Sequence, residues 1–207
     1  MSDIIFRYFP SLSDFQKDKL SQLNKIYIRW NSMINVISRK DMDNFMLHHV
    51  LHSMAIGKVI TFLPGTRILD VGTGGGFPGI PLAILFPGSE LTLMDSIEKK
   101  IRVVSAVAEE LGLENVIPVR KRVEDEKVKY HLIVSRAVTD FRGFVNMTSK
   151  NIDRYGTNSL RNGILYLKGG DLSIELSQFK NKVTVININS FFDEPYFDTK
   201  KIVYLPV

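Results

Sequence analysis

The sequence predicts an α/β domain with a seven-stranded, mostly parallel sheet and a reversed terminal strand, preceded by an N-terminal helical extension. From residue 66 onward, short apolar runs alternate with helical segments, which is typical of parallel strands joined by right-handed crossovers. Before residue 66 the apolar residues recur at spacings of three and four, which is typical of amphipathic helices. We therefore expect an extension over residues 1–65 and the sheet domain over residues 66–207, packed as one compact unit.

Two helices are expected in the extension. Ser13 and Gln16 have the spacing of a capping box, and apolar residues then recur at helical spacing as far as Ile34. Residues 31–43 are polar and predict a turn. A second helix is expected over residues 46–60, closed by the Pro-Gly pair at 64–65.

Seven apolar runs after residue 65 predict the strands: 68–71, 91–94, 116–119, 132–134, 164–167, 183–188 and 202–207. The clearest helix lies over residues 97–111 and stops at Gly112. Pro118 cannot donate to a sheet ladder, so the third strand is expected to be short or near an edge. The last two runs have no helical pattern between them, and they predict an antiparallel pair that brings in the reversed strand.

Composition excludes several kinds of protein. The 207 residues include 27 Lys and Arg against 22 Asp and Glu, a net charge of +5, and no cysteine. A basic balance fits a polyanionic partner without establishing one. Without cysteine, disulfide scaffolds, Cys-ligated zinc, Fe–S clusters and thiolate nucleophiles are excluded. No run reaches the roughly 20 apolar residues of a membrane span and the N-terminus does not resemble a signal peptide, so we expect a cytoplasmic protein without membrane association.

A glycine-rich loop follows the first predicted strand. Four of the five residues 72–76 are glycine, directly after Asp70-Val71. The loop therefore lies at the sheet edge where doubly wound folds bind ligands, and its glycines allow close backbone approach and positive φ. A tight turn without a ligand is the alternative. Ordering such a loop costs much conformational entropy, which favours a ligand.

The second strand is expected to end at Asp95, 23 residues after Gly72. A carboxylate there can accept hydrogen bonds from both ribose hydroxyls, a feature common to NAD and S-adenosylmethionine. Pro78 and Pro81 remove N–H groups that a dinucleotide pyrophosphate would use, which disfavours NAD. A solvated carboxylate, or one that caps the next helix, is the alternative for Asp95.

Four segments together resemble the RsmG family, also known as GidB: DVGTGGGFPGIPLA at 70–83, LMDSIEKK at 93–100, VSRA at 134–137 and LKG at 167–169. The likeness runs from about Trp30 to Gly170. Members of this family are class I S-adenosylmethionine-dependent methyltransferases with a Rossmann-like fold. They methylate N7 of a guanine in the 530 loop of bacterial small-subunit ribosomal RNA. The resemblance thus implies S-adenosyl-L-methionine as cofactor and 16S rRNA or the small ribosomal subunit as partner.

The resemblance also implies that Gly72, Phe77, Val123, Glu124 and Arg136 contact the cofactor. With Gly74 of the loop and Asp95, these residues make up the expected cofactor site. Phe77 is expected to shield the methionine or sulfonium region, and Val123 and Glu124 to border the adenine. Without the resemblance, Glu124 would be assigned to a solvated charged loop. Arg136 follows the fourth strand, where a cation is costly unless it pairs with a carboxylate, phosphate or base. It is the candidate for positioning and electrostatics in catalysis, with helix capping or a salt bridge as the alternative.

One segment of the second helix departs from the family. Many members read Arg-His-x-Leu-Asp-Ser where residues 48–53 read HHVLHS, so His48 and His52 replace an arginine and an aspartate. His49 matches. The i, i+4 spacing of His48 and His52 suits metal ligands, but no partner carboxylate is evident and Cys ligands are impossible. We expect no metal site, and histidines that are partly buried or face RNA.

Methylation at guanine N7 needs no general base, because N7 carries an in-plane lone pair and no proton. Catalysis would come from in-line positioning and from electrostatics around a purine that becomes cationic. Consistent with this, residues 135–138 lack the Asn- or Asp-Pro-Pro-Tyr/Phe motif of enzymes that methylate exocyclic amines. The cysteine nucleophile of pyrimidine C5 methyltransferases is also missing.

RNA binding is expected to combine the N-terminal helices with seven basic side chains: Lys99, Lys100, Arg102, Arg120, Lys121, Arg122 and Lys168. The protein is expected to be a monomer. Two alternatives remain open: a methyltransferase for another RNA position or a small molecule, and a nucleotide-binding module without catalysis.

Overall fold

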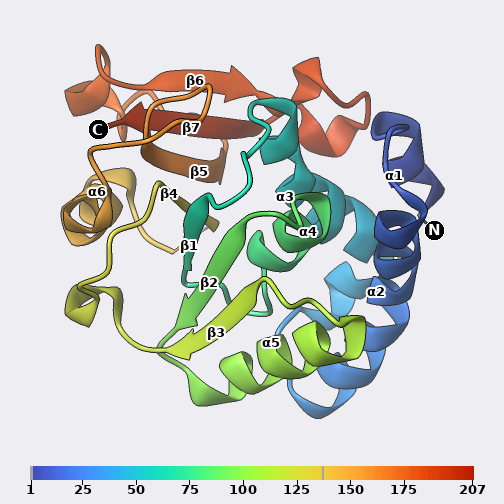
Figure 1. Ribbon diagram of the computed structural model, residues 1–207. Coiled ribbons are helices and arrows are strands. Elements are labelled where there is room, and N and C mark those ends of the chain that lie inside the picture. The colour runs from blue at the N-terminus through green and yellow to red at the C-terminus, as the bar shows by residue number, and fades with distance from the viewer. Residues whose placement is uncertain (1, 137) are drawn as a thin grey trace.

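The computed structural model describes residues 2–136 and 138–207, which form a seven-stranded sheet in the order β3-β2-β1-β4-β5-β7-β6 (Figure 1). The strands are β1 (Arg67–Val71), β2 (Glu90–Asp95), β3 (Val116–Arg120), β4 (Leu132–Arg136), β5 (Gly163–Gly169), β6 (Thr184–Asn187) and β7 (Lys200–Pro206). The first five are parallel, and β7 runs antiparallel to both β5 and β6. The predicted sheet, its reversed strand and the edge position of β3 are confirmed.

The helices are α1 (Asp3–Tyr8), α2 (Asp14–Met33), α3 (His52–Met54), α4 (Gly79–Leu85), α5 (Glu98–Leu111) and α6 (Phe141–Thr148). The capping box of α2 is confirmed, because the Ser13 side chain accepts from the Gln16 N–H and the Gln16 side chain accepts from the Ser13 N–H. The end of α5 is also as predicted, with Gly112 in the left-handed region at φ +60°.

The N-terminal segment differs from the prediction in three places. Helix α1 was not anticipated, and residues 39–44 of the expected turn form a 3₁₀ helix. The second helix is irregular, with a π-helical turn over Met46–Leu51, the short α3 and a 3₁₀ turn over Ala55–Lys58. Its last turn ends at Lys58, before Pro64, and Ile60 and Phe62 are buried in a segment without regular secondary structure.

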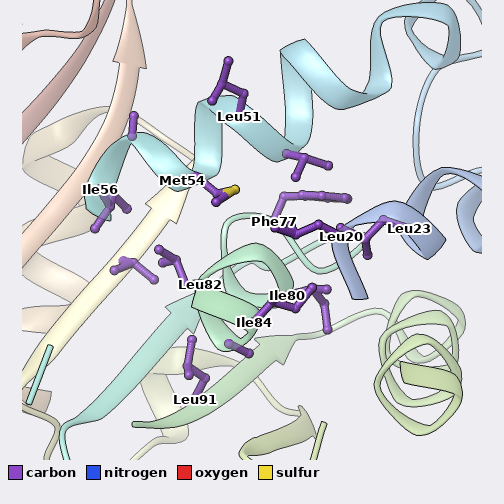
Figure 2. Packing of buried hydrophobic residues seen from close by; sticks show 14 of the residues in the cluster. Leu20, Leu23, Leu51, Met54, Ile56, Phe77, Ile80, Leu82, Ile84 and Leu91 are labelled. Carbon is purple, nitrogen blue, oxygen red and sulfur yellow. The ribbon is translucent and has the colours of Figure 1, made fainter. Parts of the chain in front are cut away.

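Two apolar clusters cover the two faces of the sheet. The larger one joins α2, the irregular second helix and α4, and Figure 2 shows Leu20 and Met54 gathered with Ile80 around α4. The smaller one lies on the other face and contains Phe144 and Tyr166. The N-terminal segment therefore packs directly on the sheet domain, and the division at residue 65 stays a prediction. In the described ranges, no helix combines the length and apolarity that crossing a bilayer requires.

Candidate functional site

The glycine loop connects β1 to α4 at the carboxyl edge of the sheet. Gly72 has φ +67°, and a Cβ atom on it would lie 2.4 Å from Cγ2 of Val138. Asp70 at the end of β1 clips the loop together, since its Oδ2 accepts from the Thr73 hydroxyl at 2.6 Å and from the Gly79 N–H at 2.8 Å. These contacts hold the loop in one conformation, with a residue at position 72 that has to be glycine.

Asp70 is a site residue that the sequence reasoning missed. Its side chain is fully buried, and Oδ1 has no hydrogen-bond partner among the described residues. Burial raises the pKa of Asp70 to about 7, against the lowering effect of its bonds to Thr73 and Gly79. The signal was available, because Asp70 lies two residues before Gly72, close enough for its side chain to join the start of the loop to the start of α4.

Helix α2 contacts the glycine loop through Tyr27. The Tyr27 hydroxyl donates to the carbonyl oxygen of Gly75 at 2.6 Å, and its ring packs against Phe77 and Phe45 with centroids 5.1 Å and 5.0 Å away. Phe77 is only 3% exposed, so its ring lies in this aromatic cluster and not on a cleft wall. Shielding of the methionine or sulfonium region by the Phe77 ring stays a prediction.

A cleft of about 350 Å³ opens at the carboxyl ends of β1 to β4. Five of the seven predicted cofactor residues line it: Gly72, Asp95, Val123, Glu124 and Arg136. Gly74 lies beside it and donates its N–H to Asp95 Oδ2 at 3.1 Å. The tertiary structure thus brings together residues from four separate strand ends.

Asp95 serves the cleft and the following turn at once. It is 6% exposed, its Oδ1 accepts from the Ile97 N–H at 2.9 Å, and Lys100 Nζ lies 3.4 Å from its Oδ2. Asp95 does not cap α5, because its bond goes to the N–H of Ile97, the N-cap residue, and α5 has no side-chain cap; the carboxylate instead closes the preceding turn and lines the cleft. A cleft of several hundred Å³ with a glycine backbone and a buried carboxylate fits an adenosyl group with its ribose hydroxyls.

A second cavity, about 490 Å³, lies on the other side of Arg136, which lines both. Its walls come from the irregular second helix, the end of β5 and the segment before β7. Asp41 lies 2.6 Å from His48 Nδ1 through Oδ1 and 2.7 Å from His49 Nε2 through Oδ2. For His48, the expectation that no carboxylate partner is present was wrong, because the 3₁₀ turn at 39–44 folds back onto the π-helical turn and brings Asp41 beside it.

Two further histidine contacts in this cavity involve Tyr196. The His48 ring stacks on the Tyr196 ring with centroids 3.9 Å apart, and His52 Nδ1 lies 3.2 Å from the Tyr196 hydroxyl. His52 is buried, and burial lowers its pKa well below the usual value. Within residues 2–136 and 138–207, no group of three or more side chains of metal-ligating type is arranged to hold a metal ion.

Arg136 is held by the second helix. Its Nη1 donates to the carbonyl oxygen of His48 at 2.9 Å, its Nη2 lies 2.7 Å from His49 Nδ1, and its guanidinium lies 5.5 Å from the Phe77 ring centroid. Burial lowers the pKa of Arg136; burial and the Arg136 charge lower that of His49 to about 4. Within the described ranges Arg136 has no ion-pair partner, so the expected carboxylate or phosphate is not supplied by the described residues. Ala137, the last residue of the VSRA segment, lies outside the described residues.

Most of the predicted RNA-binding side chains already have acidic partners. Lys100 pairs with Asp95, Lys121 with Glu126, and both Arg102 and Arg120 with Glu98. Lys168 is half-buried, donates to the Thr139 carbonyl oxygen at 2.9 Å and pairs with Glu175 at 2.6 Å. It is therefore neither simply solvated nor free for phosphate. Lys99 and Arg122 are exposed and make no ion pair with any described residue.

The strand order, the glycine loop and the carboxylate after the second strand define a class I S-adenosylmethionine-dependent methyltransferase fold. A SAM-dependent methyltransferase from Aquifex aeolicus has a similar fold, with a TM-score of 0.56 and 14% identity, covering 74% of this chain and 88% of that one. Precorrin-6y C5,15-methyltransferase from Geobacter metallireducens also has a TM-score of 0.56, at 10% identity, covering 84% and 92%. At such identities the likeness concerns the fold alone.

The chain belongs to the GidB family, described as rRNA small subunit methyltransferase G, whose model matches residues 16–194. It is 51% identical to Ribosomal RNA small subunit methyltransferase G of Cytophaga hutchinsonii over 203 residues, which cover 98% of both proteins. It is also 51% identical to the protein of the same name from Porphyromonas gingivalis, over all 207 residues and 94% of that protein. The family resemblance drawn from the sequence is confirmed.

Proposed function

We propose that this protein transfers the methyl group of S-adenosyl-L-methionine to N7 of a guanine in the 530 loop of 16S rRNA, at position 527 in the usual numbering. The observation that best supports methyl transfer is the pair of cavities that meet at Arg136. One of them fits an adenosyl cofactor, and the other opens beside it with an aromatic and cationic lining. The choice of guanine N7 rests on the family resemblance.

On the cofactor side, Asp95 would accept hydrogen bonds from the ribose, and the backbone at Gly72 and Gly74 would approach the methionine portion. Val123 is buried at the cleft wall and Glu124 is exposed beside it, so these two residues would border the adenine. When bound, S-adenosyl-L-methionine supplies a methyl group on a positively charged sulfur. The residues of this cleft bind and orient; none of them needs to exchange a proton.

On the acceptor side, the second cavity would receive the target base. It is lined by Tyr196, by the histidines and by Lys200, whose Nζ lies 4.7 Å from the Tyr196 ring centroid. Aromatic and cationic side chains of this kind suit a nucleotide drawn out of an RNA strand. The groups beside Arg136 that could act as bases are engaged with one another, and attack by the N7 lone pair does not require one.

The RNA strand would contact the basic surface around the cleft. Lys99 and Arg122 are available there, while Lys100, Arg102, Arg120, Lys121 and Lys168 would have to exchange a carboxylate for a phosphate. Since phosphate contacts release counterions, activity on ribosomal particles should fall as salt rises. Activity that is flat between low and moderate salt would contradict this electrostatic contribution.

Nucleoside mass spectrometry of 16S rRNA from cells with and without the gene tests the proposal. We expect 7-methylguanosine in the 530-loop fragment to disappear in the deletion strain and to return when the gene is restored. An unchanged amount would refute the assignment. Calorimetry with S-adenosylhomocysteine, NAD and ATP tests the alternative of a non-catalytic nucleotide-binding module, which tight binding of NAD or ATP alone would support.

A further inference from the structure

A continuous chain of polar contacts runs from Asp41 through His49 to Arg136, between the cofactor cleft and the second cavity. His49 Nδ1 lies 2.7 Å from Arg136 Nη2, and His49 Nε2 lies 2.7 Å from Asp41 Oδ2. A guanidinium can only donate, so His49 Nδ1 must accept. The proton of the neutral ring is therefore on Nε2, where it donates to Asp41. These contacts assign both the charge and the tautomer of His49.

The contacts from Asp41 through His49 to Arg136 are held in place by neighbouring side chains. His49 is 8% exposed, with its ring stacked on Phe45 at a centroid distance of 6.0 Å and edge-on to Phe77 at 5.3 Å. The second oxygen of Asp41 binds His48, so the carboxylate is fixed at two points. The imidazole cannot turn without breaking these contacts and disturbing the aromatic cluster beneath the glycine loop.

Most of the N–H groups of the Arg136 guanidinium make no hydrogen bond to a described residue. Of the five N–H groups of a guanidinium, two are used, by the His48 carbonyl oxygen and by His49 Nδ1. The other three have no hydrogen-bond partner among the described residues, in a side chain that lines both cavities. The side that faces the second helix fixes the guanidinium, and the remaining donors are left for ligands.

We propose that His49 and Asp41 are positioning residues for methyl transfer, which hold the Arg136 guanidinium between cofactor and acceptor nucleotide. The inference rests on the proposed function, in which the two cavities receive these two ligands. Both residues act through Arg136. A guanidinium in a fixed place can orient the acceptor without reorganising during the reaction, which is where positioning contributes most.

Three variants of the full-length protein test the contacts from Asp41 through His49 to Arg136. His49→Leu removes both contacts, His49→Asn can keep an acceptor toward Arg136 but cannot reach Asp41, and Asp41→Asn removes the charge. With saturating S-adenosyl-L-methionine and small-subunit RNA, we expect the single-turnover rate of His49→Leu to fall about 100-fold. The other two variants should show intermediate losses. The affinity of Asp41→Asn for S-adenosylhomocysteine, measured by calorimetry, should change little, because the Asp41 side chain contacts His48 and His49 and not Asp95 or the glycine loop.

His131→Asn is the matched control. The His131 ring also accepts a hydrogen bond at Nδ1, from the Arg67 N–H at 2.9 Å, but it precedes β4 at the opposite sheet edge. This variant should lose thermal stability without losing transfer rate. If His49→Leu fails to fold, Asp41→Asn decides the question, since the Asp41 side chain is 35% exposed and tolerates an isosteric change.

The protonation of His49 gives a readout that does not depend on the RNA. In ¹⁵N NMR spectra of the full chain at pH 7, His49 should be neutral and protonated on Nε2. An imidazolium, or a proton on Nδ1, would overturn the inference whatever the substrate is. An active wild-type protein whose three variants transfer methyl at the wild-type rate would also overturn it. A wild-type protein that does not methylate small-subunit RNA would instead contradict the proposed function.

Discussion

The two cavities that meet at Arg136 are assembled in different ways. Apart from Arg136, the cofactor cleft takes most of its walls from the loops after β1, β2 and β3, where each residue follows its own strand. The second cavity joins residues 41–52, the end of β5 and residues 196–200, which are far apart in the sequence. The first is a property of strand ends, whereas the second exists only because an irregular helix packs beside the C-terminal strands.

The cavities also differ in the kind of side chain that lines them. The cofactor cleft contains the Asp95 carboxylate, and none of its described lining residues is aromatic. The second cavity is lined by Tyr196 and three histidines, and its Asp41 carboxylate is held by two of those histidines. The difference favours ribose hydroxyls on one side and a base on the other, and the following variants test it.

The largest effect is expected from Gly72→Ala. The new Cβ would lie 2.4 Å from Val138 Cγ2 at φ +67°, so the loop must move, and binding of S-adenosylhomocysteine should weaken about 100-fold or more. Gly112→Ala is the control, because Gly112 has φ +60° but open space around its Cβ position. Calorimetry should show wild-type affinity for Gly112→Ala. Equal affinities for the two variants would show that the Gly72 contact is not critical.

Asp95→Asn should weaken S-adenosylhomocysteine binding on the order of 10-fold, since it removes a charged acceptor for the ribose hydroxyls. The KM for RNA should not change, because Asp95 does not line the second cavity. Asp153→Asn, which changes an ion-paired aspartate near the opposite sheet edge, is the control. A change in RNA KM with unchanged cofactor affinity would reverse our assignment of the two cavities.

Tyr196→Ala tests the assignment of the second cavity to the RNA. Loss of the ring that stacks on His48 and lies against Lys200 should remove an aromatic contact from the wall of the second cavity. We therefore expect the KM for RNA to rise about 10-fold and the S-adenosylhomocysteine affinity to stay unchanged. Tyr155→Ala is a suitable control, because Tyr155 is 84% exposed and follows Asp153, away from both cavities. Steady-state methylation of small-subunit RNA measures both variants. An unaltered RNA KM for Tyr196→Ala would exclude a nucleotide contact at this residue.

The smallest expected effect is a pH dependence of folding stability that comes from Asp70, beside the cofactor cleft. Burial raises the pKa of Asp70 from 3.8 to about 7 in the folded state, so between these values the folded protein binds more protons than the unfolded chain. The contribution of Asp70 to the free energy of unfolding is therefore present at low pH and is lost as the pH rises toward 7. Urea unfolding of wild type and Asp70→Asn should show the wild-type advantage shrinking over this interval. A pH-independent difference would contradict the raised pKa.

The sequence predicted features that depend on a single residue more accurately than features that depend on contacts between distant parts of the chain. Pro118 indicated an edge strand and Gly112 a helix end, and both were right because the relevant constraint lies within the residue itself. The aromatic cluster around the Phe77 ring was not predicted, since it depends on Tyr27 and Phe45 from another part of the chain.

By itself, the sequence determined the fold class, the glycine loop, the carboxylate at Asp95 and the family. Strand periodicity, glycine conformation and strand-end position are local, so they can be recognised along the chain. Only the tertiary structure decided that Asp41 binds two histidines and that His49 holds Arg136 between two cavities. Those contacts depend on a π-helical turn and a packed aromatic cluster, whose stability comes from residues distant in sequence and which no local pattern predicts.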